Sequence, residues 1–271
     1  MKKFFFSLMA FAIAMNAFAY DLAVEGQQYW GSNCAAYGLA DGTVAVTTYY
    51  LPTDYTEIWI PTALEVWEGD VKTAEYEVSQ VGYDTWGAIY VEQNGAQANN
   101  VVTAVHIAEG VKLINTSAFA TWQYDGVVEA TQFLALASVE LPSTLTTIGD
   151  YGFHGADALR SIKCDAATAP AIGADGFKGL SAWDAITTQC NVYVPSEAAK
   201  ETYNQQGGAN GLAWSYWGEF YKNGNVIVES GNTTSITEVE VTTKTRKIIR
   251  NGQILIERNG VYYNLTGAVA E

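Results

Sequence analysis

The chain has two histidines, His106 and His154, that could serve as the base of a catalytic triad. A triad also needs a nucleophile in a recognisable setting, and the sequence contains no Gly-x-Ser-x-Gly, His-Glu-x-x-His or phosphate-loop motif. Carboxylates are plentiful, so a glycosidase-like pair is compatible with the composition, but no pair stands out by position. We therefore interpret both histidines as ordinary surface residues. We predict no catalytic residue, no cofactor and no metal site, and hence no enzyme.

Residues that could bind a ligand recur in five short segments, each with two apolar residues flanking a variable one. The segments are residues 58–61, 105–108, 139–142, 162–165 and 192–195. Strand side chains alternate between faces, so the flanking residues would face a core and the middle residue would face out. A strand that buries one face must stack on neighbours, and repeated strands of this kind predict a solenoid.

Stacking would align the middle residues as one outward column, since adjacent strands lie about 4.8 Å apart. The column contains Trp59, His106, Glu140, Lys163 and Tyr193. A second, parallel column contains Glu57, Ala104, Ser138, Ser161 and Asn191. The first column mixes aromatic and charged side chains, as protein-binding surfaces do. We take it as the candidate ligand-binding face.

Three cysteines, Cys34, Cys164 and Cys190, leave at least one thiol without a partner in the same chain. In the repeat alignment, Cys190 lies four residues upstream of the position that matches Cys164. Four strand residues span roughly 13 Å, whereas a disulfide needs Cα atoms within about 7 Å. We predict that Cys164 and Cys190 are not bonded and that Cys164 fills the core. A bond between Cys34 and Cys190 stays open.

A second motif follows three of the strands and places a phenylalanine five residues after an isoleucine. The pairs are Ile114 and Phe119, Ile148 and Phe153, and Ile172 and Phe177, with residues 78–82 as a degenerate first copy. Both side chains of each pair can reach the core from the opposite wall of the coil. Glycines between them would allow a tight turn.

The two motifs together resemble the repeat of the BspA-like leucine-rich repeat family of bacterial surface proteins. That repeat reads roughly L-x-x-I-x-I-P-x-x-[VL]-x-x-I-G-x-x-A-F-x-x-C, and residues 139–153 match it closely. The likeness extends over residues 55–220. It implies a mainly β fold with short helices, namely a leucine-rich repeat solenoid with an N-terminal β cap and a small C-terminal β meander.

Residues 1–19 are predicted to be a signal peptide, because two lysines precede an apolar stretch that ends at the small-x-small site 17–19. Cleavage near Ala19 removes two lysines and no acid, which takes the formal charge from −15 to −17. Such a charge disfavours nucleic acid and anionic membranes as partners. No other apolar run is long enough to span a membrane.

The end of the chain carries further signals. Ser196 is predicted to cap a helix over residues 197–203, and Tyr203, Trp214 and Trp217 would then close the last coil. Two Asn-Gly turns, at 251–252 and 259–260, predict a three-stranded meander that resembles tails used for type IX-like sorting. The predicted parts are a signal peptide (1–19), an N-terminal β cap (20–90), a solenoid with C-cap (91–222), a linker (223–243) and a C-terminal β module (244–271).

The resemblance implies a noncatalytic protein that is secreted or held at the surface of a Gram-negative bacterium. Its partner would be an extracellular protein or matrix ligand, bound in adhesion or host interaction. One alternative is a glycan-binding module that uses Trp86, Trp122 and Trp183. A second is a carbohydrate-active enzyme. A third is a largely structural or secretion-escorted protein with no dedicated ligand.

Overall fold

The structure is a computed structural model that describes most of the chain between residues 20 and 263. The described ranges are 20–83, 88–98, 100–124, 127–130, 133–180, 185–204, 217–229, 245–250, 253–258 and 261–263. The predicted signal peptide and residues 230–243 of the predicted linker lie outside them. The chain divides into two units, Met1–Glu229 and Ser230–Glu271.

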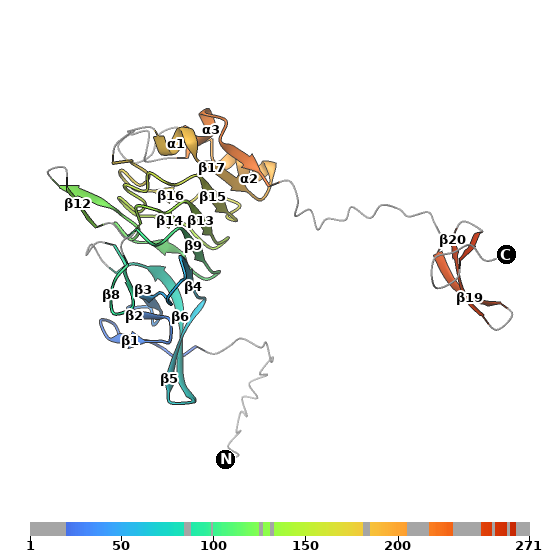
Figure 1. Ribbon diagram of the computed structural model, residues 1–271, viewed down its shortest axis with the longest axis horizontal. Coiled ribbons are helices and arrows are strands. Elements are labelled where there is room, and N and C mark those ends of the chain that lie inside the picture. The colour runs from blue at the N-terminus through green and yellow to red at the C-terminus, as the bar shows by residue number, and fades with distance from the viewer. Residues whose placement is uncertain are drawn as a thin grey trace, which may run out of the picture. The chain divides into compact units, whose positions relative to one another are not determined.

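A six-stranded parallel sheet, called here the front sheet, forms one wall of the first unit. Its strands are β4 (Glu57–Ile60), β9 (Ala104–Ile107), β13 (Ser138–Leu141), β15 (Ser161–Cys164), β17 (Asn191–Val194) and β18 (Val226–Val228). Successive strands pair in register and place one buried row along the sheet: Ile58, Val105, Val139, Ile162, Val192 and Val226. Figure 1 shows β9, β13, β15 and β17 as successive layers. The solenoid expected from the sequence is confirmed.

The opposite wall, called here the back sheet, is built from parallel strands that begin inside the predicted cap. They are β3 (Val44–Tyr50), β6 (Val71–Val81), β10 (Leu113–Ile114), β14 (Thr147–Ile148) and β16 (Ala171–Ile172). Their register aligns Val46, Val81, Ile114, Ile148 and Ile172 as a second interior row. Val81 of residues 78–82, the predicted degenerate first copy, thus occupies the isoleucine position of the second motif.

The remaining N-terminal strands extend this same back sheet. They are β1 (Gln28–Trp30), β2 (Cys34–Gly38), β5 (Ala63–Glu68), β7 (Tyr90–Gln93) and β8 (Ala96–Gln97). β1, β2 and β3 pair antiparallel, and β5 and β6 form a hairpin. A separate hairpin, β11 (Trp122–Tyr124) with β12 (Val127–Ala130), lies within the insertion after Phe119. The open end of the first coil is therefore covered by strands that are part of the back sheet.

A column of aromatic rings fills the interior between the two sheets. Phe119, Phe153 and Phe177 stack nearly parallel, with centroid separations of 5.1 and 5.3 Å. Trp217 and Phe220 then pack against Phe177 and end the column. The phenylalanines of the second motif therefore do reach the core, one per coil.

Among the described residues, three short helices cover the last coil: α1 (Ala185–Gln189), α2 (Glu197–Thr202) and α3 (Gly218–Lys222). Ser196 caps α2 by accepting a hydrogen bond from the Ala199 N–H at 3.0 Å, as expected. Tyr203 and Trp217 are fully buried, and the Trp217 indole N–H donates to the Pro170 carbonyl at 2.7 Å. Trp214, predicted to join this lid, lies outside the described residues.

The second unit contains a three-stranded antiparallel sheet of β19 (Thr245–Arg250), β20 (Gln253–Arg258) and β21 (Val261–Tyr263). Its strands coincide with those predicted from the two Asn-Gly turns. The expected C-terminal meander is thereby confirmed.

Candidate functional site

The five candidate residues form one column across the front sheet. Direct register pairs join Trp59 to His106, His106 to Glu140, Glu140 to Lys163, and Lys163 to Tyr193. Trp59 and Glu140 are exposed, whereas His106, Lys163 and Tyr193 are half-buried. The alternation of the strands therefore places all five on the side of the sheet that faces away from the core.

A sixth member, Ile227, was missed by sequence reasoning. Strand β18 pairs with β17 and sets Ile227 opposite Tyr193. The predicted linker from residue 223 is therefore wrong for 226–228, which form the last rung. Residues 226–228 do show an apolar run, but an apolar residue in the middle position and the preceding Asn-Gly at 223–224 hide the repeat pattern.

Trp59 and His106 form a tight stack at one end of the column. Their ring centroids lie 3.8 Å apart and their planes differ by 9°. His106 Nδ1 lies 2.9 Å from a Glu140 carboxylate oxygen, and His106 Nε2 lies 3.5 Å from a Glu57 oxygen. The imidazole thus lies flat on the indole with Nδ1 hydrogen-bonded to Glu140, whereas the buried Nε2 makes no hydrogen bond to Glu57. His106 lies in the outward column, as the strand alternation predicted.

Acidic side chains dominate the rest of this face. Lys163 lies 3.8 Å from both Asp165 and Glu229. Partial burial raises the pKa of Asp165, Lys163 opposes this shift, and the charges of Glu229, Glu109 and Glu140 add to it. The face therefore carries an excess of carboxylates around one lysine, which favours a cationic ligand.

The prediction that His154 is an ordinary surface residue is wrong, because its side chain is buried in the turn after Phe153. Burial lowers the pKa of His154, and the nearby Lys178 charge lowers it further, while Asp175 and Asp157 oppose the shift. Its ring packs edge-on against Tyr151, with centroids 5.7 Å apart. His154 is on the far side of the coil from the column and is a packing residue.

All three cysteines are buried and free. Burial raises the pKa of Cys34 and Cys190 to about 12 and also raises that of Cys164. Cys164 lies in the interior as predicted, and the bond between Cys34 and Cys190 that we left open is not formed. Thiols this far from ionisation are poor nucleophiles and poor metal ligands.

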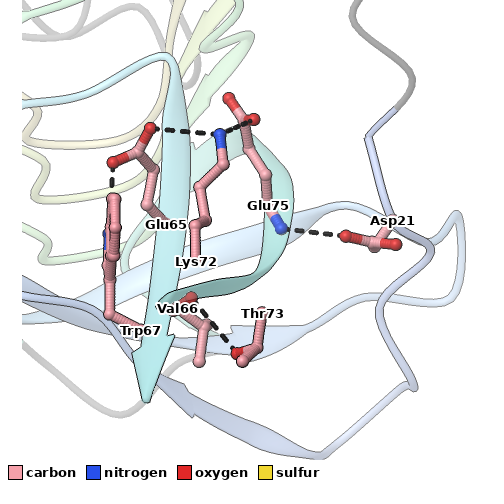
Figure 2. A network of polar contacts seen from close by, with 7 residues as sticks. All are labelled: Asp21, Glu65, Val66, Trp67, Lys72, Thr73 and Glu75. Atoms are coloured by element: carbon pink, nitrogen blue, oxygen red, sulfur yellow. Dashed lines mark hydrogen bonds and ion pairs between the residues drawn. The ribbon is translucent and has the colours of Figure 1, made fainter. Parts of the chain in front are cut away.

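A cleft of about 310 Å³ lies beside the β5–β6 hairpin, lined by residues 31–34, 61–65 and Glu75. Figure 2 shows Lys72 between the carboxylates of Glu65 and Glu75, with ammonium distances of 3.4 and 2.7 Å. The Trp67 indole N–H donates to Glu65, and the Glu75 backbone N–H donates to the Asp21 carboxylate. These acids are already paired within the chain, so the cluster consolidates the hairpin.

Within the described ranges, no cluster of three or more histidine, cysteine or acidic side chains could hold a metal ion. The same residues include no helix with the length and apolar character needed to cross a membrane. Of the tryptophans in the glycan-binding alternative, Trp86 and Trp183 lie outside the described residues. Trp122 is described only as part of the backbone of β11.

No family model and no curated protein matches the chain. Three solved structures are similar to it. A leucine-rich repeat protein from Bacteroides capillosus ATCC 29799 is 21% identical, over 62% of this chain and 99% of that one, with a TM-score of 0.40. A leucine-rich cell surface protein from Faecalibacterium prausnitzii A2-165 is 16% identical, over 89% and 62%, with a TM-score of 0.34. A leucine-rich repeat protein from Bacteroides ovatus ATCC 8483 is 16% identical, over 62% and 47%, with a TM-score of 0.26.

Proposed function

We propose that this chain is a noncatalytic repeat protein that binds an extracellular protein through the outward face of its front sheet. The observation that carries the proposal is the in-register column of Trp59, His106, Glu140, Lys163 and Tyr193. Trp59 is 57% exposed, although an indole is among the most costly side chains to leave in water. Exposed tryptophan beside charged residues is typical of the anchors of protein interfaces.

The shape of the site supports a macromolecular ligand. With Ile227 the column has six rungs, whose five spacings of about 4.8 Å give a strip roughly 24 Å long. This length is close to the side, about 28 Å, of a square patch with the standard interface area of about 800 Å² per partner. The column lies on an open strand face, whereas small-molecule sites are usually concave and enclosed. A flat strip with an aromatic end and excess carboxylates is suited to a protein with a basic surface.

The location outside the cytoplasm belongs to the same proposal. The signal-peptide pattern of residues 1–19 and the resemblance to BspA-like proteins favour a secreted or surface protein of a Gram-negative bacterium that acts in adhesion or host interaction. The C-terminal sheet, as part of a separate unit from Ser230 onward, would act as the sorting module. Sorting is tested by fusing residues 230–271 to a passenger protein and measuring its export.

The experiment that tests ligand binding is capture from host extract with residues 20–271, followed by identification of the captured protein and measurement of its Kd. The variant W59A/E140A/Y193A removes the column. We expect this variant to raise the Kd by at least about 100-fold, because truncation of each interface anchor costs about 1–2 kcal/mol or more of binding free energy.

The matched control is E68A/D70A/V71A, which removes exposed side chains at the tip of the β5–β6 hairpin. It should bind as the unmodified chain does. Equal binding by all three proteins would exclude the front sheet as the ligand face. A glycan array run beside the capture separates the alternative, since strong sugar binding together with no captured protein would favour a glycan-binding module.

A further inference from the structure

One face of the Trp59 indole is covered by His106, and the opposite side has no neighbouring rung. Strand β4 is the last strand of the front sheet at this end. The indole itself remains 57% exposed.

A carboxylate lies beside this exposed ring. Glu57 is two residues before Trp59 on the same strand, so both side chains project from the same face. The Glu57 side chain is half exposed, and only one of its two oxygens is recorded near His106, at 3.5 Å. The site thus offers a flat aromatic surface and, on the same face of the same strand, a half-exposed carboxylate.

His106 shows that a flat polar ring can stack on this indole. Its Nε2 lies 3.5 Å from a Glu57 oxygen but makes no hydrogen bond there. An incoming flat group that carries N–H donors can stack on the other side of Trp59 and supply the hydrogen bond to Glu57 that His106 does not make. The surrounding charge selects among such groups, because Glu57 and Glu140 flank a single histidine and favour a cation.

We infer that the ligand of the front sheet presents an arginine side chain at this end, with its guanidinium stacked on the open face of Trp59 and donating to Glu57. Guanidinium is planar, permanently charged, weakly hydrated and able to stack while its edge N–H groups bind a carboxylate. A lysine ammonium is a point charge that does not match the flat ring, and a neutral planar group leaves the Glu57 carboxylate without a counter-charge. This inference rests on the proposed function and names the side chain that the partner must carry.

The test follows the indole N–H signals of residues 20–271 labelled with ¹⁵N, with the Trp59 signal assigned from its loss in W59F. The protein is titrated with three capped amino acids: N-acetyl-arginine amide, N-acetyl-lysine amide and the neutral arginine isostere N-acetyl-citrulline amide. We expect the arginine probe to shift the Trp59 signal in a saturable manner. Its apparent Kd should be at least about 5-fold lower than that of the lysine probe, and citrulline should give no saturable shift.

Two variants assign the effect to the carboxylate. E57Q should raise the Kd of the arginine probe by at least about 3-fold. E68Q, which neutralises an exposed acid on β5, should leave the Kd of the arginine probe unchanged. Equal affinity for arginine and lysine, a citrulline response equal to that of arginine, or an unmoved Trp59 signal would overturn the inference.

The two proposals fail separately. If W59A/E140A/Y193A loses the captured partner but arginine never moves the Trp59 signal, the front sheet remains the ligand face and the arginine inference falls. If the captured partner binds that triple variant normally, the proposed function fails, and the arginine inference fails with it.

Discussion

Gly149 lies where two successive coils approach each other closely. A Cβ atom built at this position would lie 2.7 Å from the Thr116 backbone nitrogen and 2.9 Å from the Asn115 carbonyl carbon. Gly173 repeats this relation against Asp150 one coil later. Neither glycine has a positive φ, so the reason for glycine here is space between coils and not the tight turn that we predicted.

We predict that Gly149→Ala lowers the free energy of unfolding by about 1–3 kcal/mol, the usual cost of forcing an extra methyl into packed structure. Urea unfolding followed by circular dichroism measures it. Gly26→Asn is the control, because a Cβ at Gly26 meets nothing within 4 Å and asparagine tolerates its φ of +74°. A Gly149→Ala protein as stable as the control would show that the coils can separate without cost.

His154 gives the stability a pH dependence. Its folded pKa is lowered mainly by burial, so the unfolded chain binds a proton at a higher pH than the folded chain does. The sign follows from linkage: the stabilisation is complete above the unfolded pKa of about 6.5 and is lost as the pH falls through the folded pKa.

We therefore expect the unfolding free energy to decrease from pH 7.5 to pH 5, and His154→Gln to reduce that decrease. Urea titrations of both proteins at several pH values give the comparison. A His106→Gln protein measured in parallel shows whether the change is specific to the buried ring. Parallel pH profiles for unmodified chain and His154→Gln would refute the assignment.

At the scale of elements, the phenylalanine stack joins consecutive coils. Phe153 is fully buried between Phe119 and Phe177, with both neighbours stacked at about 5 Å. Removing its ring leaves a cavity between two coils. This cavity cannot collapse unless the back-sheet strands of those two coils move.

We predict that Phe153→Ala costs about 3–5 kcal/mol, whereas Phe153→Leu, which keeps most of the volume, costs less than about 2 kcal/mol. Thermal and urea unfolding of both variants provide the measurement. Similar losses for the two substitutions would mean that restoring the apolar volume does not restore stability, and would contradict the cavity argument.

The rows of the front sheet could be predicted from the sequence because an alternating strand encodes which side chains share a face. The outward column and the buried residue Cys164 follow from that period alone. The contacts of the column could not be predicted, since the stack of Trp59 on His106 depends on rotamers chosen against neighbouring strands. Strand β18 was missed because its middle residue is apolar.

The back sheet shows a different limit. Its row at Ile114, Ile148 and Ile172 was visible because each of these isoleucines is followed five residues later by a phenylalanine. The contribution of β3 was hidden, because Val46 lies far from Val81 in sequence and a long hairpin intervenes. The burial of His154 was also missed, since nothing in a single repeat shows which turn residues the next coil will cover.

For the whole molecule, the division at residue 229 separates a complete solenoid from the C-terminal sheet. Strand β18 ends at Val228 and completes the front sheet before the division. We predict that residues 20–229 fold without the tail, with a urea midpoint within experimental error of that of residues 20–271.

Near-UV circular dichroism of the tryptophans gives a second readout for this deletion. A companion truncation at residue 222, which also removes β18, should be clearly less stable because it leaves β17 as an unpaired edge. Loss of structure on deletion of residues 230–271 alone would show that the tail is needed for folding.

The in-register pairing of β13 with β15 makes residues 139–161 an interchangeable module. Val139 matches Ile162 and Leu141 matches Cys164, so one pass of the chain ends where the next begins. A tandem copy of this stretch would lengthen the molecule by one layer while both ends keep their own closures. Duplication of this stretch in the gene can therefore change the number of layers without altering the fold. The length of the binding strip changes with it.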